Sequence, residues 1–137
     1  MADLADAVWT QGERFGTIGC TVDGQPYEIT THRAEAYDAD SRKPRVVFGD
    51  DIADDLARRD FTVNAMAVDT ADRALVDPYG GRGDLSAGVL RTPLDPEVSF
   101  SEDPLRMLRA ARFHAGYELD PVPVLVDAMV SLGDRME

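Results

Sequence analysis

Residues 101–115 combine a carboxylate with several arginines at helical spacing. Asp103 and Arg106 stand near the start of a predicted helix. Two further arginines, Arg109 and Arg112, follow at three-residue spacing. Because residues three and four apart lie on one helix face, an acidic acceptor, a guanidinium fork and two more cations can converge on one small anionic ligand with a hydrogen-bonding edge. This spacing favours a nucleotide site, although the segment alone also fits a solvated amphipathic helix.

A second cluster places two arginines directly before an aspartate, where a helix is expected to end and a strand to begin. In Arg58, Arg59 and Asp60, a guanidinium can grip a phosphate and the carboxylate can accept a hydrogen bond from a ribose hydroxyl. The alternative is a charge pair at a helix C-terminus, where arginines are favoured in any case. Either cluster alone therefore leaves a purely structural role open.

The elements that must position these clusters begin with β-rich sequence. Residues 15–22 and 26–31 flank Asp23-Gly24, a common signal for a short hairpin, and predict two paired strands. The other elements expected before residue 95 are a polar turn at 37–44, a strand at 46–48, a helix from 51 to 58 or 59 with Ile52 and Leu56 buried, a second hairpin around 70–73, a turn at 78–83, a helix at 84–87 and a strand at 89–92.

The last part of the chain has a helical pattern. Asp95-Pro96 is interpreted as a break after the strands. A helix is expected over 103–115, with Pro104 tolerated in its first turn, and another over 123–132. Strands come first and helices last, which predicts the α+β class.

Composition limits the function classes. The 137 residues suffice for one small domain, and a net charge of −12 argues against a free-standing nucleic-acid binder, which gains affinity by neutralising phosphates. With one cysteine, Cys20, and two histidines, the chain cannot assemble an intrachain disulfide or a closed Cys/His zinc site. The sequence contains no run of about 18 apolar residues that would span a bilayer, so we expect a cytoplasmic protein with no membrane partner.

Three long motifs follow one another along the chain: Arg-Arg-Asp-Phe-Thr-Val-Asn-Ala-Met-Ala at 58–67, Asp-Pro-Tyr-Gly-Gly-Arg-Gly-Asp-Leu at 77–85, and Glu-Asp-Pro-Leu-Arg-Met-Leu-Arg-Ala-Ala-Arg-Phe at 102–113. Together they resemble the family of class II tRNA nucleotidyltransferases (CCA-adding enzymes) and bacterial poly(A) polymerases. The resemblance implies a polymerase-β-like nucleotidyltransferase head with antiparallel or mixed strands, followed by the first helices of an all-α neck. The later part of the head is expected over residues 1–98, and the start of the neck, with the base-reading helix, over 99–137.

The resemblance also implies roles for individual residues. Cytosine and adenine each present an amine donor beside a ring-nitrogen acceptor, whereas uracil and guanine present the opposite pattern, so an Asp acceptor beside an Arg donor accepts C and A. Glu102, Asp103 and Arg106 match the positions that read the base in this way. The expected triphosphate contacts are Arg59, Arg109 and Arg112, the expected ribose contact is Asp60, and Gly80, Gly81, Arg82 and Asp84 fall in the family's mobile loop.

The chain departs from the family pattern in its metal ligands. Transfer of this type uses two Mg²⁺ ions held by an Asp-x-Asp pair after a glycine-rich turn, and the sequence contains no such arrangement. Asp38 and Asp40 share the spacing but are interpreted as part of a solvated loop. Glu28 matches the family's third acidic position, and a plain carboxylate on a hairpin strand is the alternative. We therefore expect no metal site in this chain and Mg²⁺ in a complete parent.

The expected protein is thus a fragment of a template-independent RNA nucleotidyltransferase. Its parent would add CMP and AMP from CTP and ATP to the tRNA 3′ end. The fragment, which lacks the N-terminal metal motif and the C-terminal RNA-binding body, would be inactive alone. Two alternatives stay open: a poly(A) polymerase that adds only AMP to RNA, and a catalytically inert nucleotide-binding module. The oligomeric state is not predicted.

Overall fold

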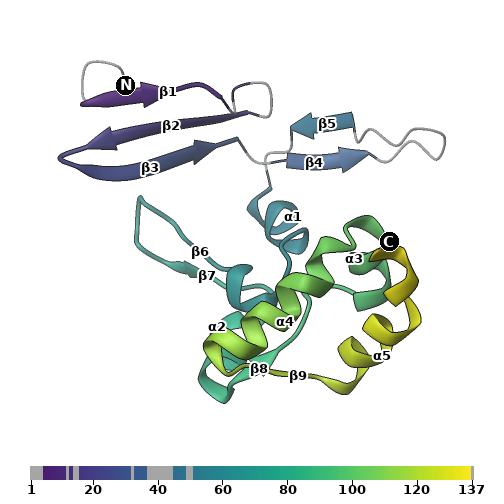
Figure 1. The fold of residues 1–137 in the computed structure, drawn as a ribbon. Helices are drawn as coiled ribbons and strands as arrows, with labels where there is room; N and C mark the ends of the chain where they lie inside the picture. The colour runs from purple at the N-terminus through teal and green to yellow at the C-terminus, as the bar shows by residue number, and fades with distance from the viewer. Residues whose placement is uncertain are drawn as a thin grey trace. The chain divides into compact units, whose positions relative to one another are not determined.

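The computed structural model describes residues 5–11, 13, 16–31, 33–36, 45–48 and 51–136. Figure 1 shows its strands and helices. The chain divides into two compact units, residues 1–52 and residues 53–137. The boundary expected at 98–99 between head and neck stays a prediction.

The first unit contains a three-stranded antiparallel sheet in the order β1-β2-β3. Its strands are β1 (Ala7–Trp9), β2 (Thr17–Val22) and β3 (Gln25–Thr30). The predicted hairpin is confirmed: Asp23 and Gly24 both have positive φ, 50° and 74°, which is the backbone that two-residue hairpin turns require.

A two-stranded sheet follows in the first unit. β4 (Arg33–Ala36) pairs antiparallel with β5 (Arg45–Phe48), which confirms the short strand expected there. The polar turn predicted before β5, which includes Asp38 and Asp40, lies outside the described residues.

Short elements begin the second unit. α1 (Ile52–Ala57) is shorter at both ends than predicted, and Leu56 is buried as expected. The second predicted hairpin is confirmed, although its strands, β6 (Ala67–Val68) and β7 (Leu75–Val76), contain two residues each. Short strands of this kind do little more than orient the loop that joins them.

A 3₁₀ turn, η2 (Thr62–Asn64), stands where the sequence predicted the start of that hairpin. The Thr62 hydroxyl donates to the Asp84 carboxylate at 2.7 Å, and the Thr62 N–H donates to the Arg91 carbonyl at 2.8 Å. Both partners lie far away in the sequence. Tertiary contacts therefore override the local strand propensity of this segment.

The glycine-rich segment after the hairpin is helical. The sequence predicts a turn at 78–83 and a helix from residue 84, but α2 (Gly81–Ala87) begins three residues earlier. The Asp77 carboxylate accepts hydrogen bonds from the N–H groups of Gly81 and Arg82 at 2.7 and 3.0 Å. These bonds satisfy donors of the first helical turn, and so they offset the poor helix propensity of glycine.

The predicted break at Asp95-Pro96 is present, but the sequence did not predict the helix that these residues start. α3 (Pro96–Glu102) has proline in its first position, where no N–H is needed. Asp95 caps the helix by accepting from the N–H groups of Glu97 and Val98 at 2.8 and 3.4 Å. The same residue pair therefore ends the preceding segment and begins the next helix.

We expect the Asp95→Ala variant to lose about 1 kcal/mol of unfolding free energy, because two N–H groups of the first turn of α3 lose their acceptor. Chemical denaturation followed by circular dichroism measures this difference. Asp95→Asn is the matched control, since its amide oxygen still caps the helix. Its unfolding free energy should stay within about 0.3 kcal/mol of that of the unsubstituted chain. An equal loss in both variants would show that the cap does not stabilise α3.

Two longer helices follow. α4 (Leu105–Tyr117) begins and ends two residues later than predicted, and α5 (Pro123–Ser131) confirms the last predicted helix. Asp103 has an extended backbone, as residues before proline prefer, and thereby separates α4 from α3. A 3₁₀ turn, η3 (Gly133–Met136), follows α5.

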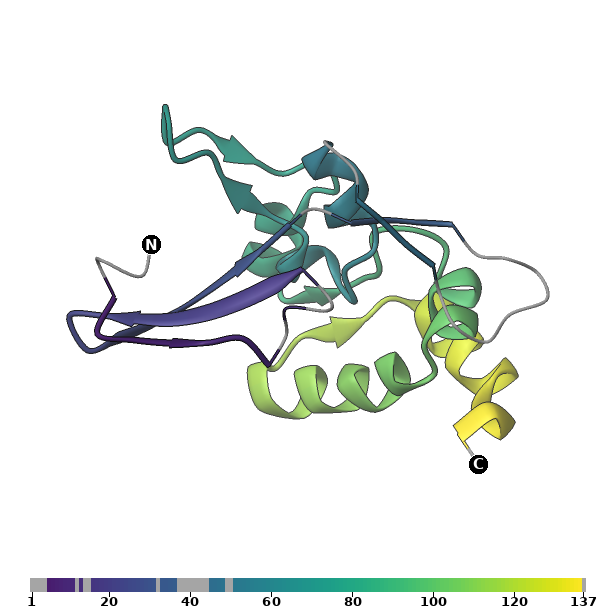
Figure 2. The same cartoon turned by 90° about the horizontal axis from the view of Figure 1, so that it is seen from above.

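The core of the second unit lies where these helices meet a pair of two-residue strands. β8 (Val89–Leu90) confirms a predicted strand, and it pairs in parallel with β9 (Asp120–Pro121), which the sequence did not predict. α4 packs on this pair, and α3 packs on both α4 and α5 (Figures 1 and 2). The buried cluster is Phe61, Leu90, Phe100, Met107, Ala110, Leu119, Leu125 and Ala128. The predicted α+β class is confirmed, and no helix in the described part of the chain is long and apolar enough to cross a bilayer.

Candidate nucleotide-binding site

A polar pocket of about 360 Å³ brings the two predicted clusters together. One wall follows α1, and the other comes from the corner between α3 and α4 and from α4 itself. The lining residues are Arg58, Arg59, Asp60, Asn64, Asp103, Arg106 and Arg109. Five of the eight predicted site residues therefore line one cavity, although they come from distant parts of the sequence.

Asp60 joins the two walls. Asp60 is 8% exposed; its Oδ2 accepts a hydrogen bond from Nε of Arg109 at 2.7 Å and lies 2.6 Å from Nη2 of the same guanidinium in an ion pair. Oδ1 accepts from the N–H of Phe61 at 2.9 Å and from Nδ2 of Asn64 at 3.0 Å. This charge-assisted arginine–carboxylate pair ties α4 to the segment after α1.

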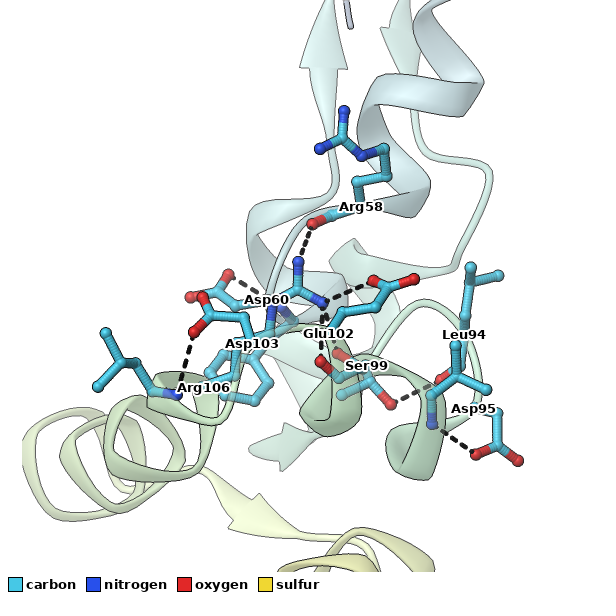
Figure 3. Close-up of polar contacts among 12 residues, drawn as sticks. Arg58, Asp60, Leu94, Asp95, Ser99, Glu102, Asp103 and Arg106 are labelled. Atoms are coloured by element: carbon cyan, nitrogen blue, oxygen red, sulfur yellow. Dashed lines mark hydrogen bonds and ion pairs between the residues drawn. The ribbon is translucent and has the colours of Figure 1, made fainter. Parts of the chain in front are cut away.

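Arg106 is held by three partners around its guanidinium (Figure 3). Nη1 donates to Oγ and the carbonyl of Ser99 at 2.8 and 3.3 Å, and Nη2 donates to the carbonyl of Arg58 at 2.7 Å. Glu102 forms a looser ion pair with Nη1 at 3.7 Å. The side chain is 14% exposed, so its rotamer is set before any ligand arrives.

The pocket wall keeps a donor and an acceptor unused. Within the part of the chain that the structure describes, no acceptor contacts Nε–H of Arg106. Asp103 accepts the N–H of Leu105 at 3.0 Å with Oδ1, while its Oδ2 has no donor among the described residues. The corner between α3 and α4 therefore offers both halves of a hydrogen-bonding edge to a ligand.

The remaining predicted cations differ in their surroundings. Arg109 is 47% exposed, and its guanidinium lies 5.9 Å from the centroid of the Phe113 ring. Arg59 forms a surface ion pair with Asp55 at 2.8 Å, and Arg112 is exposed on α4 outside the pocket lining. Exposed ion pairs contribute about 0.2–1 kcal/mol, so a phosphate group can compete for Arg59.

Sequence reasoning missed two residues that support the site. Asn64 lies in the quoted motif but had no assigned role, and it donates to Asp60 from four residues away. Ser99 is 5% exposed and binds Arg106. The sequence signal for Ser99 is Asp95 followed by Pro96, a pattern typical of a helix start. The helix that begins there places Ser99 next to Arg106.

The carboxylates expected near a metal ion form no site in the described residues. Glu28 stands on β3 of the first unit, exposed and opposite Gly19 in the strand register, and its proposed role stays a prediction. No group of three or more His, Cys, Asp or Glu side chains within the described ranges could hold a metal ion. The residues present there therefore do not fit the Mg²⁺ expected for a complete parent.

Comparison with known proteins gives matches over most of the chain. A family model of the poly A polymerase head domain matches residues 1–91. The CCA-adding enzyme of Bacillus subtilis is 45% identical over 113 residues, which cover 80% of this chain and 28% of that protein. The CCA-adding enzyme of Leuconostoc citreum is 40% identical over 127 residues, which cover 92% of this chain and 31% of that protein. The chain thus spans less than a third of the length of these curated relatives.

Solved structures give the same result. The CCA-adding enzyme of Bacillus stearothermophilus in complex with CTP matches with a TM-score of 0.79 at 33% identity, over 94% of this chain and 30% of that one. A tRNA nucleotidyltransferase complexed with a primer tRNA and an incoming ATP analog matches with a TM-score of 0.71 at 33% identity, over 93% of this chain and 35% of that one. These matches confirm the resemblance inferred from the three motifs.

Proposed function

Because the chain belongs to the family of poly A polymerase head domains, we propose that it supplies the nucleotide-selecting pocket of a template-independent RNA nucleotidyltransferase, which adds CMP and AMP to the 3′ end of tRNA. The nucleotide substrates are CTP and ATP. The names of the curated relatives support tRNA CCA addition. The solved relatives with CTP, and with an ATP analog beside primer tRNA, support these partners.

The observation that carries the proposal is the unused donor and acceptor at the corner between α3 and α4. Cytosine and adenine present an amine that Asp103 can accept and a ring nitrogen to which Arg106 can donate. Uracil and guanine would place a carbonyl oxygen against the Asp103 acceptor and a ring N–H against the Arg106 donor, which leaves both side chains unpaired. Such unpaired polar groups oppose binding strongly, so the pocket selects C and A.

The arginines around this corner suit a triphosphate. Arg59 and Arg109 line the same pocket as Asp103 and Arg106, and Arg112 extends the cationic stretch along α4. Guanidinium groups match phosphate oxygens with paired N–H donors. The local positive charge allows nucleotide binding in spite of the net charge of −12 on the whole chain.

The role assigned to this chain is nucleotide selection. In reactions of this class, two Mg²⁺ ions activate the attacking hydroxyl and stabilise the departing pyrophosphate. The described residues contain no cluster that would hold such ions. No catalytic step is therefore assigned to them.

A second candidate function is the addition of AMP alone, which the description of the matching family favours. The base-reading edge cannot separate the two functions, because cytosine and adenine share the same donor and acceptor pattern. Binding of ATP without CTP would support the second candidate.

Calorimetric titration of the chain with CTP, ATP, UTP and GTP tests the proposal. We expect CTP and ATP to bind at least about tenfold more tightly than UTP and GTP. The Asp103→Ala variant should lose this preference, because it lacks the acceptor for the base amine. Asp127→Ala removes one carboxylate from the exposed face of α5 and serves as the control with the same charge change. Equal affinity for all four nucleotides, or no binding of any, would contradict the proposal.

A further inference from the structure

Ser99 is bonded to both residues that present the unused donor and acceptor at the corner between α3 and α4. Its carbonyl accepts from the N–H of Asp103 at 3.2 Å and from Nη1 of Arg106 at 3.3 Å. Its hydroxyl oxygen accepts from the same Nη1 at 2.8 Å. The place of Ser99 is fixed in turn, because the adjacent Phe100 is buried in the core. Ser99 therefore sets how Asp103 and Arg106 lie relative to each other.

The guanidinium of Arg106 is anchored at two nitrogens by two separate segments (Figure 3). Nη1 is bonded to Ser99 on α3, and Nη2 donates at 2.7 Å to the carbonyl of Arg58, which follows α1. Because the group is planar, two anchors on different nitrogens stop its rotation, so the direction of Nε–H is fixed as well. A fixed direction matters for reading a base, because a hydrogen bond weakens steeply when its angle departs from linearity.

The hydroxyl of Ser99 makes the shortest contact to Nη1 of Arg106 in the described part of the chain. The carbonyl of Ser99 lies at 3.3 Å, and the Glu102 carboxylate forms an ion pair at 3.7 Å. Without the hydroxyl, the guanidinium could turn toward Glu102 and keep its charge paired. Loss of this one oxygen should therefore change the direction of the donor more than the charge of the pocket.

We propose that Ser99 is a positioning residue for nucleotide selection, whose hydroxyl holds Arg106 in the orientation that distinguishes C and A from U and G. This inference rests on the proposed function, because it takes base reading by Asp103 and Arg106 as its premise. Ser99 is 5% exposed and stands outside the pocket lining, so it acts through Arg106 and not on the nucleotide. An arginine released from Ser99 can turn its donor toward more than one pattern of base edge, which lowers selectivity.

Calorimetric titrations with CTP, ATP, UTP and GTP test this role in the complete chain and in its Ser99→Ala variant. We expect Ser99→Ala to lower the preference for CTP over UTP by about fivefold, the worth of one hydrogen bond to a charged group. The affinity for UTP should change by less than about twofold, because the arginines that suit the phosphates keep their contacts. Ser86→Ala makes the same change on the exposed face of α2 and should leave all four affinities unaltered.

Ser99→Thr and Ser99→Val form a matched pair, because the two new side chains have almost the same shape and differ in the hydroxyl. We expect Ser99→Thr to keep the preference for CTP over UTP within about twofold and Ser99→Val to lower it as Ser99→Ala does. An equal preference in both variants would show that the hydroxyl is not the group that acts, and would overturn the inference. Circular dichroism checks that each variant is folded.

Different outcomes separate the proposed function from this inference. If the unsubstituted chain binds no nucleotide, or binds all four equally, both are overturned. If it prefers CTP and ATP and Ser99→Ala keeps that preference within about twofold, the inference alone is wrong. If Ser99→Ala weakens all four nucleotides by one factor, Ser99 has a merely structural role, which also overturns it. Should the two β-branched variants fail to fold, Ser99→Ala alone decides, because it removes one atom and suits a helix.

Discussion

Replacing Arg106 by alanine is expected to abolish CTP binding by this chain, with a loss of at least about a hundredfold in affinity. The Nε–H of Arg106 is the donor that pairs with the Asp103 acceptor in a base-reading edge, and the arginine side chain is fixed before the ligand binds. Without it, the ring nitrogen of the bound cytosine loses its hydrogen-bond donor. Calorimetric titration with CTP measures the loss.

The same substitution also destabilises the fold, so the two effects must be separated. It leaves Oγ of Ser99 and the carbonyl of Arg58 without their donor, which should cost about 1–3 kcal/mol of unfolding free energy. Arg106→Lys keeps a positive charge that can reach one of these acceptors but cannot present a fork to a base, so it should recover stability and not affinity. Arg135→Ala, at an exposed arginine of η3, is the control for the change in charge. Retention of CTP affinity within about threefold in Arg106→Ala would refute the base-reading role.

The parts of the fold that sequence reasoning predicted correctly are those whose signals are local. Asp23-Gly24 predicts its hairpin because both residues accept positive φ, and the turn depends on nothing else. α5 begins at a proline and has apolar positions at helical spacing, so it was placed almost to the residue. In such segments, local propensity and the final contacts favour the same conformation.

The parts that sequence reasoning missed depend on side-chain caps that it overlooked or on partners elsewhere in the chain. Asp95-Pro96 ends the strand region as predicted, but sequence reasoning missed the helix that the same pair begins, which places Phe100 in the core. The helix at Gly81 needs the Asp77 carboxylate four residues earlier, which outweighs the poor propensity of glycine. The parallel pairing of β8 with β9 joins two-residue strands across α4, and no local pattern encodes it.

In the candidate site, the residue types could be read from the sequence, but the way the fold arranges them could not. The chemistry of Asp60, Asp103 and Arg106 could be inferred from residue type and spacing, and the resemblance supplied the expected base contact. The pairing of Asp60 with Arg109 could not be inferred, because a hydrogen bond across 49 residues depends on how α4 packs. An aspartate after two arginines suits either a ribose or an arginine, and residue type alone does not decide between them.

Gly81→Ala is expected to be the most destabilising of the small substitutions in the second unit, with a loss of about 3 kcal/mol of unfolding free energy. A Cβ at residue 81 would lie 2.0 Å from the carbonyl oxygen of Thr62 and 3.0 Å from Cγ of Met66. The backbone of η2 cannot move away freely, because the Thr62 hydroxyl and N–H are bound to Asp84 and Arg91. Urea denaturation of the variant and of the unsubstituted chain measures the difference in unfolding free energy.

Gly83→Ala is the matched control, since it makes the same change two residues further along α2. Nothing lies within 4 Å of a Cβ at residue 83, and the position is exposed. Alanine there should raise the unfolding free energy by about 0.5–1 kcal/mol, because it loses less backbone entropy than glycine when the helix forms. The opposite signs distinguish steric contact with η2 from helix propensity, and similar shifts in both variants would mean that α2 does not pack against Thr62. Because Thr62 lies two residues after Asp60, Gly81→Ala should also weaken CTP binding, while Gly83→Ala leaves it unchanged.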